Sequence, residues 1–162
     1  EPTPTQWRLL RPLLWSTTVI LVRHAERDAS GGGDPDLNAA GRERARLLGR
    51  MTQDAKLRAV YVTATKRSRQ TGKPSAVAAG VGYSEYDATD AAALAARIRA
   101  DAPGGTVLVV AHSNTVDDIG AALGAGSIGE LADTTFDRMF VISRSWCRTQ
   151  LLRLRYGAPT PP

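Results

Sequence analysis

The stretch VILVRHAE, residues 19–26, is the part of the sequence that decides the fold. Residues 19–22 are all aliphatic and carry neither a charge nor a glycine, which is typical of a strand buried on both faces of a parallel sheet. Arg23 and His24 follow this strand directly. Because ligand sites of open α/β sheets lie just beyond the carboxyl ends of the strands, this pair is the first candidate for a functional site.

A second apolar run, TVLVV at residues 106–110, also ends next to a histidine, His112. These are the only two histidines of the whole sequence, and both come shortly after an apolar run. Strand-like and helix-like segments alternate along the chain, which predicts an α/β fold of three layers, with helices flanking a mainly parallel central sheet. If the two apolar strands are parallel neighbours, both imidazoles lie at the same edge of that sheet.

The remaining elements are predicted from caps and spacing. Asn38 is expected to cap the first helix, and Pro74 is expected to start or kink a helix that ends at Gly80. Two late strands are predicted at residues 139–142 and 150–156, and the second is expected at an edge of the sheet because it alternates leucine and arginine.

The length of 162 residues suits one domain. We expect residues 1–17 to form an N-terminal arm that packs one or both of its tryptophans on the domain, residues 18–156 to form a single domain, and the proline-rich residues 157–162 to be a disordered tail. The net charge of +5 favours binding of anions such as phosphate esters. The basic residues are scattered and aromatic residues are few, so no nucleic-acid partner is expected. No apolar run is long enough for a membrane span.

The sequence says little about the compartment. Cys147 is the single cysteine, so no internal disulfide is possible. The chain begins at Glu1 rather than Met. This favours an exported protein, periplasmic or extracellular, whose leader has been removed, and a cytoplasmic location is the alternative.

Arginine and histidine in this arrangement suit phosphoryl transfer. A guanidinium group binds phosphate oxygens in pairs, and a neutral imidazole, favoured where nearby cations lower its pKa, is a nucleophile toward phosphorus. A second histidine, when protonated, stabilises charge on the transferred group. A metal site is the alternative, with further ligands available from Glu26, Asp87 and Asp117. Arg23 beside His24 would oppose a divalent cation, so no metal is expected. No organic cofactor is implied either.

Four segments resemble, in the same order, the motifs of the histidine phosphatase superfamily, which includes the cofactor-dependent phosphoglycerate mutases. They are LVRHAE at residues 21–26, DPDLNAAG at 34–41, RSRQT at 67–71 with Pro74 after it, and VLVVAHSNT at 107–115. The resemblance implies a phosphoglycerate mutase-like fold.

The resemblance also implies roles for individual residues. His24 would be the nucleophile that becomes phosphohistidine, and Arg23, Arg67 and His112 would complete the phosphate pocket. The motif alone distinguishes Arg67 from its neighbour Arg69.

Two assignments rest on weaker matches to the family pattern. Ser30 stands where the family often has an asparagine, and its hydroxyl is expected to contact the phosphate. The general acid is assigned to Asp87, which follows the strand expected at residues 83–86, and Glu85 on the same strand is the alternative.

The function implied by the resemblance is that of a small phosphatase of histidine acid phosphatase type. It would hydrolyse a small-molecule phosphomonoester or a phosphoprotein and release inorganic phosphate. Residues 28–36 and 124–135 offer little material for a lid, and a mutase must keep its phosphoenzyme from water, so hydrolysis is favoured over mutase-type phosphotransfer. A non-catalytic phospholigand-binding domain with the same pocket is the alternative from another class.

Overall fold

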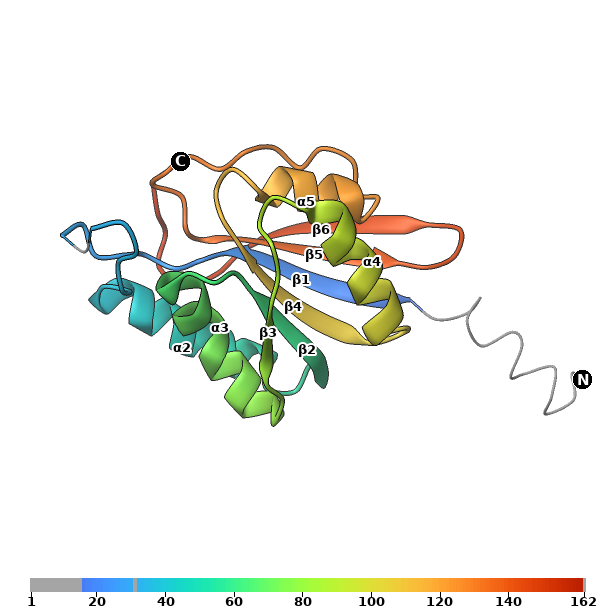
Figure 1. Ribbon diagram of the computed structural model, residues 1–162, viewed down its shortest axis with the longest axis horizontal. Coiled ribbons are helices and arrows are strands. Elements are labelled where there is room, and N and C mark those ends of the chain that lie inside the picture. The colour runs from blue at the N-terminus through green and yellow to red at the C-terminus, as the bar shows by residue number, and fades with distance from the viewer. Residues whose placement is uncertain (1–15, 31, 162) are drawn as a thin grey trace, which may run out of the picture.

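The computed structural model describes residues 16–30 and 32–161, so most of the expected N-terminal arm, with both of its tryptophans, lies outside the described residues. Within these ranges six strands form one sheet in the order β3-β2-β4-β1-β5-β6 (Figure 1). Their bounds are β1 (Thr17–Arg23), β2 (Leu57–Val62), β3 (Tyr83–Glu85), β4 (Thr106–Ala111), β5 (Arg138–Arg144) and β6 (Thr149–Arg155).

The sheet is mixed. Strands β3, β2, β4 and β1 are parallel to one another, whereas β5 pairs antiparallel with both β1 and β6. The two apolar runs, β1 and β4, are parallel neighbours at the centre, with Arg23 opposite Ala111 at the end of the pairing. This arrangement confirms the predicted α/β fold and places the segments that follow both strands at one edge of the sheet.

Helices cover both faces of the sheet (Figure 1). Helices α2 (Ala39–Thr52) and α3 (Lys66–Ala79) contribute to the apolar core on one face, and α4 (Ala91–Asp101) and α5 (Val116–Ala122) contribute to the core on the other. The three predicted layers are therefore present.

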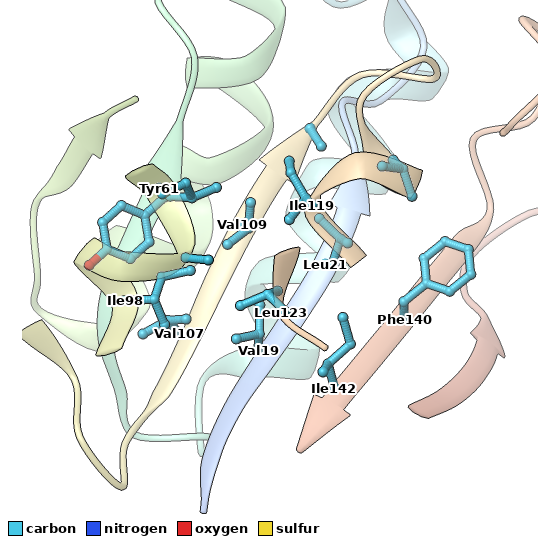
Figure 2. Packing of buried hydrophobic residues seen from close by; sticks show 14 of the residues in the cluster. Val19, Leu21, Tyr61, Ile98, Val107, Val109, Ile119, Leu123, Phe140 and Ile142 are labelled. Carbon is cyan, nitrogen blue, oxygen red and sulfur yellow. The ribbon is translucent and has the colours of Figure 1, made fainter. Parts of the chain in front are cut away.

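Residues 19–22 of β1 are buried on both faces of the sheet, as their lack of polar side chains predicted. Val19 and Leu21 point into the core with α4 and α5, as Figure 2 shows, whereas Ile20 and Val22 belong to the core under α2 and α3. Burial of each such side chain contributes about 1.5–3 kcal/mol, and the strand sets the position of Arg23 at its end.

Helix α3 begins earlier than predicted. Thr65 caps it by accepting a hydrogen bond from the backbone N–H of Ser68, and Pro74 lies inside the helix instead of starting it. Of the two roles expected of Pro74, the start of a helix is wrong, and its place inside α3 leaves the kink as the remaining role. Here Pro74 packs so closely on α2 that a Cβ added at Gly49 would lie 2.9 Å from the Pro74 Cβ. Packing between α2 and α3 thus stabilises a helix that contains a proline.

Residues 157–161, for which a disordered tail was expected, are hydrogen-bonded to the rest of the fold. The Ala158 carbonyl accepts a hydrogen bond from Arg44, and the Thr160 side chain is hydrogen-bonded to Phe136 and Asp137. Composition suggested disorder because of the prolines, whereas these partners are distant in sequence and are brought together by the fold.

Gly41→Ala is expected to lower the free energy of unfolding by about 2–3 kcal/mol, as overpacking does. A Cβ at Gly41 would overlap the Glu26 backbone oxygen, because the first turn of α2 lies directly against the segment that follows His24. The control is Gly82→Ala, since a Cβ there meets no atom within 4 Å. Urea unfolding should show a large loss for the first variant only, and equal effects of both would contradict this packing argument.

Candidate active site

The two histidines meet at the ends of the two central strands. The His24 backbone N–H donates to the Ala111 carbonyl at 2.9 Å, which links the end of β1 to the end of β4. The ring centroids of His24 and His112 are 5.3 Å apart, with an angle of 61° between the ring planes. The predicted meeting of the two imidazoles at one edge of the sheet is therefore present.

His24 is only 3% exposed and held in a defined orientation. Its Nδ1 is 2.8 Å from the Ala25 carbonyl oxygen, and because a carbonyl only accepts, Nδ1 carries the proton. In the neutral ring Nε2 then has a free lone pair, as a nucleophile requires. Burial, the adjacent Arg23 and the neighbouring His112 lower the pKa of His24 to about 3, despite the opposing hydrogen bond to Ala25.

His112 is half-buried and is held by a residue that the sequence analysis did not single out. The Thr63 hydroxyl, which directly follows β2, lies 2.9 Å from His112 Nε2. Burial and the cations Arg67 and Arg23 lower the pKa of His112 to about 4. A protonated second histidine was expected from the sequence, whereas the lowered pKa of His112 favours the neutral ring until an anion binds beside it.

Arg23 is almost fully buried, and backbone carbonyls hold one end of its guanidinium group. Its NH1 donates to the carbonyls of Ala132 and Thr135 at 2.8 and 3.0 Å, and its Cζ lies 4.2 Å from the centre of the Phe136 ring. Burial lowers the pKa of Arg23 to about 10, opposed by Asp133, whose carboxylate lies 3.8 Å from NH2. The group remains a cation near neutral pH, with its Nε buried and unpartnered.

Arg67 approaches the histidines from the first turn of α3. Its NH1 is 3.5 Å from an Asp34 carboxylate oxygen, a long contact. The Nε atoms of Arg67 and Arg23 are two of the three buried side-chain polar atoms without a partner in the described part of the chain. Buried donors of this kind favour binding of an anion, because an unpaired donor costs free energy. Arg69 is not among the residues that line the cleft described next, and it forms an ion pair with Glu85 at 2.7 Å.

These side chains border a cleft of about 430 Å³. The lining residues carry several cations and hydroxyl groups and few apolar side chains: Arg23, His24, Arg27, Gly33, Pro35, Arg67, Ala88, Thr89, His112, Ser113, Asn114, Thr115 and Asp133. Neutral imidazoles beside guanidinium groups have the chemistry that suits a small, multiply charged anion such as a phosphate group.

Two predicted site residues are not among those that line the cleft. The carboxylate of Asp87 accepts hydrogen bonds from the Thr89 backbone N–H and hydroxyl, which lower the pKa of Asp87, the opposite of what a general acid needs. Ser30 donates its hydroxyl to Asp28 at 2.8 Å. In both cases a short polar side chain is used in a local turn, which competes with a role in the cleft.

Glu85, the alternative acid, is engaged by Arg69 and does not line the cleft either. Among the described residues that line the cleft, only Asp133 carries a carboxylate, and its side chain is 91% exposed. Nothing in the sequence pointed to Asp133, which lies in a loop. Thr63 could have been predicted as a site residue from the sequence, because it directly follows a strand inside the sheet, as His24 does.

Across residues 16–30 and 32–161, no three His, Cys, Asp or Glu side chains lie close enough together to hold a metal ion. None of the helices described is both long enough and apolar enough to cross a bilayer.

The low histidine pKa values predict how stability depends on pH. In the unfolded chain a histidine has a pKa near 6.5 and binds a proton below this pH. In the folded protein His24 and His112 bind a proton only when the pH approaches 3 to 4. The free energy of unfolding should therefore fall as the pH decreases from 6.5 toward 4. In phosphate-free buffer the contribution of His24 should be about 2 kcal/mol between pH 7.5 and 5.

The test of this dependence compares the chain with its His24→Asn variant by urea unfolding at both pH values. The variant should lose less stability between pH 7.5 and 5, because asparagine does not titrate. Equal losses in the two proteins would contradict the lowered pKa of His24.

Comparison with protein families supports the motif assignment. A family model described as the histidine phosphatase superfamily (branch 1) matches residues 19–90, which include the first three motifs and end before His112. None of the curated protein sequences compared with the chain matches it. The family match, together with the fold of the solved structures below, confirms the predicted resemblance to this superfamily.

Solved structures share the phosphoglycerate mutase-like fold. A mycobacterial glucosyl-3-phosphoglycerate phosphatase superposes with a TM-score of 0.67 at 15% identity, covering 88% of this chain and 100% of its own. The protein histidine phosphatase SixA complexed with tungstate has a TM-score of 0.65 at 18% identity, covering 85% of this chain and 96% of its own. YhfR of Bacillus stearothermophilus has a TM-score of 0.66 at 18% identity, covering 83% of this chain and 95% of its own. At these identities the likeness concerns the fold.

Proposed function

We propose that this chain, which carries the histidine phosphatase superfamily pattern over residues 19–90 on a phosphoglycerate mutase-like fold, is a phosphatase that hydrolyses phosphate monoesters through a phosphohistidine on His24. The observation that carries the proposal is the 5.3 Å approach of His24 and His112 in a cleft that also holds Arg23 and Arg67. The named phosphatases among the similar structures support a hydrolase over a mutase.

In the first step the lone pair of His24 Nε2 attacks phosphorus. The N–P bond forms as the ester P–O bond breaks, and the leaving oxygen takes a proton to become an alcohol. Arg23, Arg67 and His112 bind the three non-bridging oxygens, whose charge is the main electrostatic demand of phosphoryl transfer. The Ala25 carbonyl keeps Nδ1 protonated, so that Nε2 is the reacting atom.

In the second step a water molecule attacks the phosphohistidine. The O–P bond forms as the N–P bond breaks, inorganic phosphate leaves, and His24 returns to its neutral form. A carboxylate is the usual group to supply and remove the protons of both steps. We assign this role to Asp133 in place of Asp87, because Asp133 lines the cleft and Asp87 does not.

Asp133→Asn is expected to lower kcat/KM for an alkyl phosphate by roughly 10²-fold, the usual effect of losing an acid–base group, with p-nitrophenyl phosphate affected far less. p-Nitrophenolate is a good leaving group and needs little protonation. The matched variant Asp87→Asn should change both substrates by less than about twofold, as expected of a surface turn residue. A loss that depends on the leaving group in Asp87→Asn instead would return the role to Asp87.

The proposed function is tested by trapping the phosphoenzyme. Rapid acid-free denaturation during turnover of a ³²P-labelled substrate should leave label on the chain that is stable in base and lost in acid, as a phosphohistidine is. The label should map to His24, and released inorganic phosphate should match substrate consumed. Transfer of the label to a second alcohol without release of phosphate would indicate mutase-type chemistry.

One observation favours a second candidate function, a phospholigand-binding domain without turnover. Asp87 and Glu85, the acids expected from the sequence, are both engaged outside the cleft. Binding of phosphate with no hydrolysis of p-nitrophenyl phosphate or of a panel of phosphomonoesters and phosphoproteins would establish this alternative.

A further inference from the structure

The segment of residues 156–161, which follows β6, is hydrogen-bonded to two parts of the fold that flank Arg23 and His24. One is the loop of residues 132–137, and the other is Arg44 of α2. The proposed mechanism uses neither contact, although together they connect this segment to both sides of the histidine motif.

The Thr160 hydroxyl is the centre of the first contact. It accepts hydrogen bonds from the backbone N–H groups of Phe136 and Asp137 at 3.0 and 3.3 Å and donates to an Asp137 carboxylate oxygen at 3.0 Å. A hydroxyl offers one donor and two acceptor positions, so all of its capacity is used within this loop.

The loop is held from further sides. Asp137 is 1% exposed, and its second carboxylate oxygen accepts from Arg155 at 2.7 Å. Burial opposes ionisation of Asp137, yet the hydrogen bonds from Arg155 and Thr160 keep its pKa below the ordinary value. The Thr135 hydroxyl donates to the Pro161 carbonyl at 3.1 Å, a second bond between the loop and the segment.

The same loop holds Arg23. The carbonyls of Ala132 and Thr135 each accept a hydrogen bond from Arg23 NH1. Phe136 lies against the guanidinium group, with its ring centroid 6.1 Å from that of His24. The loop whose carbonyls hold the Arg23 guanidinium group is therefore the same loop that Thr160 contacts, one residue further along the chain.

The second contact reaches the other side of the motif. Arg44 donates to the carbonyls of Tyr156 and Ala158 at 2.6 and 2.8 Å. It also binds both carboxylate oxygens of Glu26 at 2.7–3.0 Å, and Glu26 lies two residues after His24. With 3% of its side chain exposed, Arg44 connects the segment to the backbone that carries the histidine.

We propose that residues 156–161 are a positioning element of the phosphate site, and that Thr160 is a positioning residue that fixes Arg23 through the loop of residues 132–137. The inference rests on the proposed function insofar as Arg23 binds a phosphate group. It assigns a role to a segment whose composition suggested only a tail.

The test measures binding of inorganic phosphate by calorimetry to the whole 162-residue chain. Thr160→Val keeps the shape of the side chain but removes all three hydrogen bonds, and should raise the Kd by roughly tenfold, as loss of about one net hydrogen bond does. Thr160→Ser keeps the hydroxyl and should stay within about twofold of the unmodified chain. In an Arg23→Ala background, Thr160→Val should add less than about twofold, because the two residues act as one unit.

A matched control separates positioning from general destabilisation. Thr52 is a buried threonine between α2 and α3 whose hydroxyl bonds to the Leu48 carbonyl and Ser75. Thr52→Val should lower the free energy of unfolding and leave the phosphate Kd unchanged. If Thr160→Val does not fold, Thr135→Val, which removes the bond to Pro161, should raise the Kd by roughly threefold.

Two results would overturn the inference alone. The first is an unchanged phosphate Kd in folded Thr160→Val, or in Thr135→Val if Thr160→Val does not fold. The second is an increase of the phosphate Kd by Thr160→Val that is as large in the Arg23→Ala background as in the unmodified chain. Failure of the unmodified chain to bind phosphate would instead overturn the proposed function, and the inference with it.

Discussion

His24→Ala is expected to lower kcat/KM for p-nitrophenyl phosphate by roughly 10⁴-fold or more, as loss of a covalent nucleophile does in other enzymes. The expectation follows from the orientation of the ring, because the Ala25 carbonyl holds Nδ1 and leaves Nε2 as the reacting atom. The N–P bond cannot form in the variant, so labelled phosphoenzyme should disappear together with turnover.

The control for this variant is binding rather than rate. Arg23 and Arg67 remain in place in His24→Ala, so inorganic phosphate should still bind, with a Kd within roughly tenfold of the unmodified chain, because two charge-assisted contacts are kept. Added imidazole is expected to restore part of the activity by occupying the space of the missing ring. Undiminished labelling of the variant would show that another residue is the nucleophile.

Arg67→Ala is expected to lower kcat by about 10²–10³-fold, the range seen when one donor to a developing charge is removed. Arg67 lines the cleft and has a buried Nε without a partner, so its guanidinium group is available for phosphate oxygens. The effect should be on kcat as well as on KM, because the contact strengthens as charge develops on the oxygens.

The neighbouring arginine provides the matched control for this prediction. Arg69 is two residues away on the same helix and pairs with Glu85 at the surface, so Arg69→Ala should change kcat by less than about twofold. Steady-state kinetics on both variants decide the assignment. Equal losses would indicate a general effect of basic charge rather than a specific phosphate contact.

The centre of the fold and part of the site could be predicted from the sequence. Residues 19–22 and 107–110 contain no polar side chain, which predicts burial on both faces and therefore a central place in the sheet. Parallel neighbours end at the same edge, so the juxtaposition of His24 and His112 followed. Arg67 was separated from Arg69 only by the family motif, because both are arginines at the start of one helix.

Other parts of the site could not be predicted in this way. Asp87 and Ser30 have the chemistry expected of them, yet each side chain is used in a local turn, by Thr89 and Asp28 respectively. Whether a short polar side chain binds its own backbone or faces a cleft depends on loop geometry, which carries no periodic signal in the sequence.

Local sequence thus determined the two central strands, the residues that end them and the order of the motifs, because these depend on side chains within a few positions of one another. The tertiary structure alone decided that Asp133 lines the cleft, that Thr63 holds His112, and that residues 156–161 support Arg23. These contacts join residues 24 to 112 positions apart, and only chain topology determines which distant loops meet.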